Sequence, residues 1–213
     1  AATVLRQPRY RDIARSTLDF MRDELLDTDG GLYSSTSAVD ASGREGATYL
    51  WEPDELKRHL PPAAYAAAQR VWRLDAARSF DDGYLPAEYR TPTADERRLL
   101  AEAARILRPL RRARSLPRDY KLNAGLNGLA LSAFSQAIRL DPAYRQRADR
   151  LQRFLLTQLV RDRQLMKARA RGQILPQAEL EDYAYVVQGL LDHAEATGNA
   201  QSRARARQLA HTA

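Results

Sequence analysis

Residues 125–159 have the sequence GLNGLALSAFSQAIRLDPAYRQRADRLQRFLLTQL, and the fold class follows from them. In the second half, Leu151, Leu155 and Leu159 recur every four positions, as on one face of a helix. Asp141 and Pro142 form a helix-start signal between two helical patterns, 125–140 and 142–159. Because the connection is so short, the two helices are predicted to pack as an antiparallel hairpin.

Helical patterns continue on both sides of this hairpin. The other predicted helices cover residues 10–25, 53–60, 63–74, 93–110 and 179–197, with a last one from Ala200. Thr93 and Glu96 match a capping box, in which Thr93 accepts from the Glu96 amide and Glu96 reaches back. Residues 165–174 are predicted to be irregular or hairpin-like. The chain is therefore expected to be all-α, with short extended segments in loops.

The composition is that of one globular domain of 213 residues, 44% of them hydrophobic and 29% charged. No apolar run approaches the roughly 18 residues that span a bilayer, so no transmembrane segment is expected. The absence of cysteine excludes disulfides, thiol nucleophiles and Cys-ligated metals, and fits a reducing compartment. No signal peptide is expected. We expect a cytoplasmic location, with a periplasmic one as the alternative.

The net charge of +7 comes from an arginine-rich sequence in which only Lys57, Lys121 and Lys167 are lysines. The arginines between Arg97 and Arg118 could form a surface for an anionic partner such as nucleic acid. However, arginine is enriched throughout the chain, and no aromatic residues interleave these runs. A solvated face is therefore the expected interpretation, and nucleic acid is not an expected partner.

Three sequence blocks occur in an order that resembles a known family. The first comprises Gly30-Gly31-Leu32-Tyr33-Ser34, Asp40-Ala41, Glu45-Gly46 and Tyr49-Leu50-Trp51-Glu52-Pro53. The second comprises Pro117-Arg118-Asp119-Tyr120-Lys121 and Leu126-Asn127-Gly128-Leu129, and the third is Glu181-Asp182-Tyr183-Ala184. In this order they resemble the thioredoxin-domain-containing family that includes the spermatogenesis-associated thioredoxin-like proteins.

The resemblance implies an (α/α)6 toroid related to six-hairpin glycosidases and sugar epimerases. Residues 1–213 are expected to form one partial toroid domain, without the thioredoxin-like domain of full-length members and without the first and last hairpins. The chain departs from the family pattern at three positions. Ser42 replaces a second carboxylate, Tyr120 replaces an Asp and Leu126 replaces a Trp. Any inherited chemistry is therefore expected to be weakened.

The candidate catalytic residues are the carboxylates Asp40, Glu45, Asp119 and Asp182. Loops line the mouth of a toroid, where paired carboxylates could act as acid and base on a glycosidic bond. The candidate substrate-binding residues are Tyr33, Trp51, Lys121, Asn127 and Tyr183. Each has a structural alternative, as a turn former, a helix cap, a partner in an ion pair or a core aromatic residue.

Metal and cofactor chemistry has little support in the sequence. His59, His193 and His211 do not have metal-ligand spacing, so no metal site is expected. The glycine-rich motifs of nucleotide binding and the Gly-x-Ser-x-Gly nucleophile motif do not occur. No cofactor is therefore predicted.

The leading functional hypothesis is a non-catalytic or weakened helical scaffold or binding subunit of a larger assembly. An open array of hairpins leaves apolar helix faces uncovered, so another protein chain is expected as a partner, and a carbohydrate is a further possible ligand. The alternative is a sugar-active enzyme, either a glycoside hydrolase or an epimerase, which uses the loop carboxylates at the toroid mouth.

Overall fold

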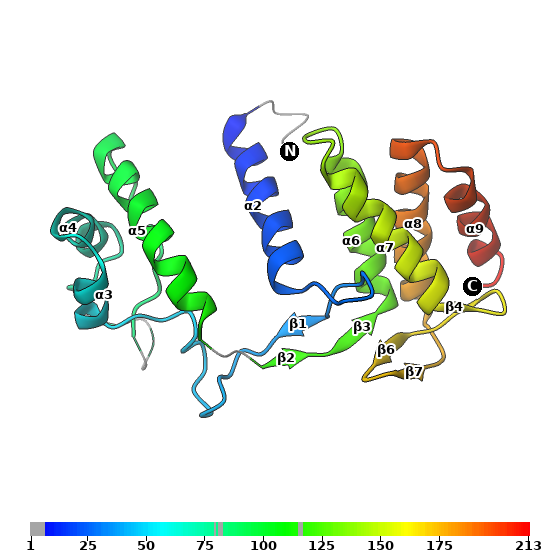
Figure 1. Cartoon of the computed structure of the whole chain (residues 1–213), viewed down its shortest axis with the longest axis horizontal. Helices are drawn as coiled ribbons and strands as arrows, with labels where there is room; N and C mark the ends of the chain where they lie inside the picture. The colour runs from blue at the N-terminus through cyan, green and yellow to red at the C-terminus, as the bar shows by residue number, and fades with distance from the viewer. Residues whose placement is uncertain (1–6, 79, 81–82, 115–116) are drawn as a thin grey trace. The chain divides into compact units, whose positions relative to one another are not determined.

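The computed structural model describes residues 7–78, 80, 83–114 and 117–213 (Figure 1). The chain forms two compact units. Unit 1 comprises Ala1–Ser35 and Asp119–Ala213, and unit 2 comprises Thr36–Arg118. The chain leaves unit 1 at β1 (Ser35–Thr36) and returns at β2 (Arg118–Asp119). Helices dominate and the strands have only two or three residues, which confirms the all-α prediction. The single domain expected for residues 1–213 stays a prediction.

Unit 1 contains the hairpin predicted from residues 125–159. Its helices are α2 (Pro8–Glu24), α6 (Ala124–Ala137), α7 (Tyr144–Gln158), α8 (Leu180–Thr197) and α9 (Ala200–Ala210). Helix α7 begins two residues later than predicted, because Asp141 Oδ1 accepts a hydrogen bond from the Ala143 amide, 2.9 Å away, in the turn before the helix. Gly198 ends α8 in the left-handed conformation, as its position predicts.

Helices α6 and α8 pack with their backbones in close contact. A Cβ atom on Gly128 would lie 2.7 Å from the carbonyl carbon and oxygen of Tyr185, and one on Gly189 would collide with the Gly128 carbonyl. Leu131 and Phe134 of α6 are fully buried in the same core. The glycines therefore allow the two helices to approach more closely than any other residue would permit.

Short strands close one end of unit 1. Strands β3 (Lys121–Asn123), β6 (Ala168–Ala170) and β7 (Gln173–Leu175) form an antiparallel sheet in the order β3-β6-β7, in which Leu122 is opposite Arg169. Strands β4 (Val160–Arg161) and β5 (Gln164–Leu165) form a separate antiparallel pair. The hairpin-like segment predicted at 165–174 is thus confirmed.

Unit 2 is built from α3 (Pro53–His59), α4 (Pro62–Val71) and α5 (Ala94–Arg112). A core that includes Leu56, Val71 and Leu100 holds them together. None of the helices in the described part of the chain, in either unit, is long and apolar enough to cross a membrane.

The predicted capping box is present at the start of α5. The Glu96 amide donates to Thr93 Oγ1 over 3.3 Å, and the Thr93 amide donates to Glu96 Oε2 over 3.0 Å. Glu96 Oε1 also accepts from Arg90, 2.6 Å away, and from Arg70, 3.1 Å away. The Arg90 hydrogen bond is the largest cause that lowers the Glu96 pKa to about 2. One carboxylate therefore connects α4, the preceding loop and α5.

We expect Glu96→Gln to lower the stability of unit 2 in a pH-dependent way. The folded pKa of Glu96 is about 2, below the ordinary value of 4.5. Its ionised form therefore stabilises the fold above about pH 4.5, and this contribution is lost as the pH falls towards 2. Denaturant unfolding across that range should show a flatter pH profile for Glu96→Gln. Asp95→Asn, which changes an exposed acid in the same turn, is the control, and identical slopes for both variants would contradict this role.

Candidate functional site

Asp40 of unit 2 lies in a tight turn of its loop. Its Oδ1 accepts from the Ser42 hydroxyl over 2.8 Å and from the Ser42 and Arg44 amides, while Oδ2 accepts from the Arg44 guanidinium over 3.0 Å. These bonds, that of the Arg44 amide first, lower the Asp40 pKa to about 2. Asp40 is therefore ionised at neutral pH, which suits a base rather than a proton donor. Glu45 is exposed on the same loop.

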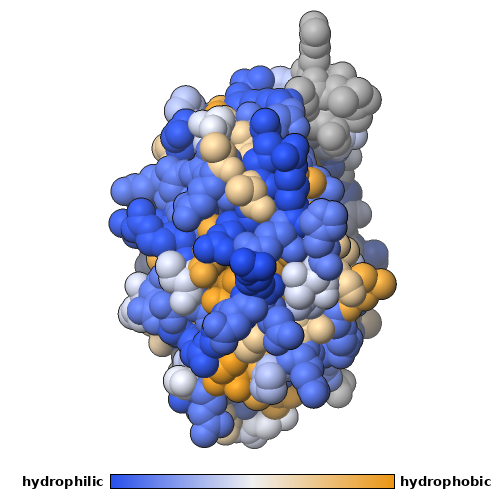
Figure 2. Space-filling model, turned by 90° about the vertical axis from the view of Figure 1, so that its right-hand side faces the viewer, coloured by the Kyte–Doolittle hydropathy of each residue, from blue (hydrophilic) through white to orange (hydrophobic). Residues whose placement is uncertain are grey.

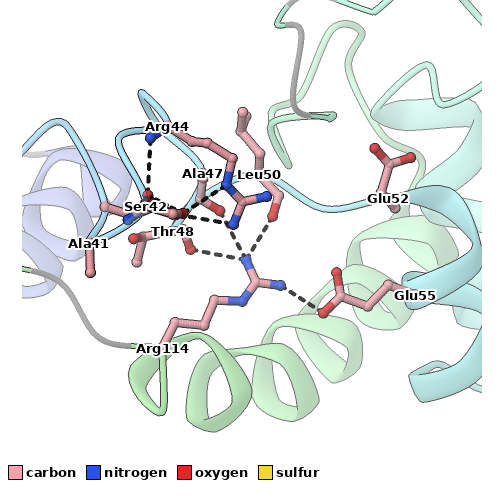
Figure 3. A pocket seen from close by; sticks show the side chains of 10 residues that line it. Ala41, Ser42, Arg44, Ala47, Thr48, Leu50, Glu52, Glu55 and Arg114 are labelled. Carbon is pink, nitrogen blue, oxygen red and sulfur yellow. Dashed lines mark hydrogen bonds and ion pairs between the residues drawn. The ribbon is translucent and has the colours of Figure 1, made fainter.

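Arg114 fixes this loop beside an open pocket of about 560 Å³ (Figure 3). Its guanidinium donates to the carbonyls of Leu50, 2.7 Å away, and Thr48, 3.1 Å away, and to Glu55 Oε1 over 2.8 Å. It also lies 3.9 Å from the ring centroid of Trp51, which is 3% exposed. Trp51 is thus a core residue covered by Arg114, and Arg114 is occupied by the loop itself.

Asn127 of unit 1 is completely buried, and its side chain bonds to backbone on both sides. Its Oδ1 accepts from the Leu32 amide over 2.7 Å, and its Nδ2 donates to the carbonyls of Leu32, at 3.0 Å, and Asn123, at 2.8 Å. The structure therefore brings together the Gly-Gly-Leu-Tyr and Leu-Asn-Gly-Leu blocks of the sequence. Asn127 is the residue that joins them.

Asp182 and Tyr183 lie at the start of α8 and face inward. Asp182 Oδ1 accepts from the Gly125 amide over 3.2 Å, and Oδ2 accepts from the Glu179 amide over 3.1 Å. The hydroxyl of Tyr183 accepts from the Leu165 amide over 3.0 Å. Both side chains are more than nine-tenths buried. In this structure they cap helix starts and complete backbone hydrogen bonding.

Asp119 and Lys121 form an ion pair in which Nζ and Oδ2 lie 3.3 Å apart. Asp119 Oδ1 also accepts from the Lys121 amide over 3.1 Å. Lys121 is exposed, while its backbone carbonyl accepts from the Ser34 amide over 2.8 Å. This pair lies where the second sequence block meets the first.

Tyr33 lines a different pocket of unit 1, with a volume of about 320 Å³. The residues that line it are Asp27, Tyr33, Tyr120, Leu122, Arg169, Arg171 and Gly172. The Tyr33 and Tyr120 rings meet edge to face, with centroids 5.4 Å apart. Tyr120 is 48% exposed, so one ring is available to a ligand. Tyr33 was predicted as a binding residue, whereas Tyr120 was noted only as a departure from the family pattern.

Asp27 and Arg169 form the polar side of this pocket. Asp27 is 7% exposed and accepts from the Tyr33 hydroxyl over 2.7 Å and from Arg169 Nη2 over 3.2 Å. Arg169 also donates to Asp29 over 2.6 Å and to Gln158 over 2.9 Å. The sequence patterns do not predict this cluster. The position of Asp27 and Asp29 immediately before the Gly30-Gly31 block is the one feature that could have indicated it.

The arrangement combines an exposed aromatic ring with a buried carboxylate, a phenol hydroxyl and two guanidinium groups. Such a pocket can hold a small polar ring by packing against one face and by hydrogen bonding at its edge. Within the described residues, no group of three His, Asp or Glu side chains is arranged to hold a metal ion. The lining of the pocket offers hydrogen bonds and aromatic contact to a ligand.

Neither a protein-family model nor a curated protein sequence matches this chain. Among solved structures, it is similar to a D-mannose isomerase, with 13% identity and a TM-score of 0.42 over 96% of this chain and 52% of the other. For a cellobiose 2-epimerase from Bacillus thermoamylovorans B4167, the identity is 13% and the TM-score 0.41, over 95% of this chain and 55% of the other. For a sugar epimerase from a ruminal bacterium, the identity is 12% and the TM-score 0.41, over 99% of this chain and 71% of the other.

The chain spans about half the length of the first two of these structures, 52% and 55%. The three proteins are sugar isomerases or epimerases by name. Similarity at this level supports no inference about a reaction or a substrate of this chain. The catalytic residues chosen from the sequence stay predictions.

We expect Asn127→Ala to lower the free energy of unfolding by about 2–4 kcal/mol, because the buried amide and carbonyl of Leu32 lose their partner. Gln136→Ala, on the exposed side of α6, should change it by less than about 0.5 kcal/mol. Urea unfolding of both variants measures the difference. Equal stability of the two variants would show that the fold does not need the Asn127 bonds.

Proposed function

We propose that this chain is a carbohydrate-binding helical subunit of a larger assembly, and that it has no catalytic role of its own. The observation that carries the proposal is the exposed Tyr120 ring, set edge to face against Tyr33 beside Asp27 and Arg169. We also propose that it belongs to the thioredoxin-domain-containing family with a six-hairpin toroid, on the three sequence blocks.

Carbohydrates suit this pocket for a chemical reason. A pyranose ring has an apolar face of C–H groups, which packs on an aromatic ring, and a rim of hydroxyls, which bond to charged groups. Tyr120 offers the ring surface, and Asp27 and Arg169 offer an acceptor and donors on the rim. Arg171, which is exposed and lines the same pocket, adds a cation that favours a sugar with a carboxylate.

The same geometry supports binding over catalysis. Asp182 is occupied by two backbone amides, and Asp119 is paired with Lys121. Asp40 is held ionised by the turn it forms, so it cannot donate a proton at neutral pH. General acid catalysis on a glycosidic bond needs a carboxyl that keeps its proton near the working pH.

The sugar-active enzyme remains the alternative, and its acids and bases would come from the carboxylates predicted from the sequence, Asp40, Glu45, Asp119 and Asp182. It makes a different prediction from the binding proposal, because an enzyme converts the ligand. Incubation of each bound sugar with the protein, followed by analysis of the sugar for hydrolysis, epimerisation or exchange of C–H hydrogens with solvent, separates the two. Conversion of any bound sugar would favour the enzyme.

We expect Tyr120→Ala to weaken sugar binding by about tenfold, because it removes a ring contact worth about 1.5 kcal/mol. A panel of neutral and acidic monosaccharides, with titration calorimetry on those that bind, provides the measurement. Tyr89→Ala is the matched control, since Tyr89 is 46% exposed, close to the 48% of Tyr120, and lies in unit 2. No binding by the panel, or equal loss in both variants, would refute a sugar site at Tyr120.

The assembly part of the proposal rests on exposed leucines of two neighbouring helices. Leu126 and Leu129 of α6 are 47% and 42% exposed, and Leu180 and Leu191 of α8 are 73% and 42% exposed. Figure 2 shows that hydrophobic residues also appear in small groups on an otherwise mainly hydrophilic face. Exposed apolar side chains on adjacent helices favour cover by another protein chain.

We expect the isolated chain to self-associate or to need a partner, because these leucines are otherwise in water. Size-exclusion chromatography with light scattering tests this, and replacement of Leu180 and Leu191 by Gln should reduce any self-association. Replacement of the exposed Glu181 and Gln188 by Ala, on the same helix, is the control. A stable, monodisperse monomer at high concentration would count against the subunit proposal while leaving sugar binding open.

A further inference from the structure

A second pocket of unit 1, of about 500 Å³, lies between α2 and the first turns of α7. Its charged lining residues are Arg15, Arg22, Arg147, Arg150, Asp19 and Asp141. Four cations therefore face two acids. None of the residues that line this pocket lines the tyrosine pocket, so its chemistry is independent of the proposed sugar site.

Arg147 is the unusual group in this pocket. It is 7% exposed, and its Nη2 donates to the Gly30 carbonyl over 2.6 Å. Its Nε is buried and has no hydrogen-bond partner within the described residues, nor does any carboxylate among them form an ion pair with Arg147. Burial and the neighbouring charge of Arg150 lower the Arg147 pKa to about 10, so the group remains cationic at neutral pH. A buried cation without a counter-charge is costly.

The two acids of the pocket are paired with two of its own arginines. Asp19 Oδ1 lies 2.9 Å from Arg22 Nη1, and Asp141 Oδ2 lies 3.9 Å from Arg15 Nη2. Asp141 Oδ1 also accepts a hydrogen bond from the Ala143 amide over 2.9 Å. Arg150 is exposed and makes no ion pair within the described part of the chain. The positive charge of Arg147 and Arg150 is therefore left for a ligand.

We propose that this pocket binds a phosphate group through Arg147 and Arg150. A phosphate has several oxygens in tetrahedral geometry and a charge near −2, so it can accept from two separate guanidinium groups at once. The pocket also includes Ala143, Tyr144 and Gln146 at the start of α7, where the helix dipole favours an anion. The group could be free phosphate or the phosphate of a sugar phosphate.

Thermal unfolding and titration calorimetry with inorganic phosphate, compared with sodium chloride at equal ionic strength, test the proposal. We expect phosphate to raise the melting temperature where chloride does not. Arg150→Gln should weaken phosphate binding by about tenfold, the effect of one lost charge-assisted bond. The exposed Arg145→Gln, on the same helix but outside the pocket, should bind as the unchanged protein does. Tyr120→Ala should also retain phosphate binding.

Arg147→Gln should weaken phosphate binding more than Arg150→Gln does. If Arg147→Gln fails to fold, Arg150→Gln still tests the proposal. A parallel titration with glucose 6-phosphate separates the two sources of the group, since tighter binding than inorganic phosphate would identify a sugar phosphate. Equal effects of phosphate and chloride would overturn the proposal. So would an Arg150→Gln variant that binds phosphate as tightly as Arg145→Gln does.

Discussion

The rest of unit 1 depends on the hydrogen bonds that the buried Asn127 side chain makes to the backbone of Leu32. It satisfies both the amide and the carbonyl of Leu32, and so fixes the segment after α2 against the start of α6. Without it, two backbone groups would be buried without partners. The same bonds set the position of Tyr33, the next residue, whose hydroxyl reaches Asp27. The tyrosine pocket thus follows from the hydrogen bonds that the Leu32 backbone makes to Asn127.

Local rules explain why much of the fold could be predicted from the sequence. The capping box of Thr93 and Glu96 and the helix end at Gly198 depend on residues within one turn, and the structure contains both. The contact between Asp27 and Arg169 joins residues that are 142 positions apart, and no local pattern encodes it. Periodicity predicts which helices exist, whereas the pairing of distant polar side chains follows only from their packing.

At the candidate site, the sequence indicates which polar residues matter but not what each of them does. Asn127, Asp182 and Tyr183 are polar residues in recognisable blocks, which is why the sequence favours Asn127 and Tyr183 for substrate binding and Asp182 for catalysis. In the structure each completes hydrogen bonds of buried backbone, at Leu32, Gly125 and Leu165 respectively. A polar residue in a motif can thus be required by the fold itself. Tyr120, a departure from the motif, is the side chain left available to a ligand.

Individual arginines differ in ways that composition does not predict. Arg114 is occupied by three backbone carbonyls and Glu55, and Arg169 by Asp27 and Asp29. Arg147 is more deeply buried than either of them but has only backbone carbonyls as acceptors. A neutral carbonyl accepts a hydrogen bond without cancelling the charge, so the electrostatic cost of burial remains. An anion in that pocket would remove this cost, so the missing counter-charge, and not the number of arginines, is what points to a ligand at Arg147.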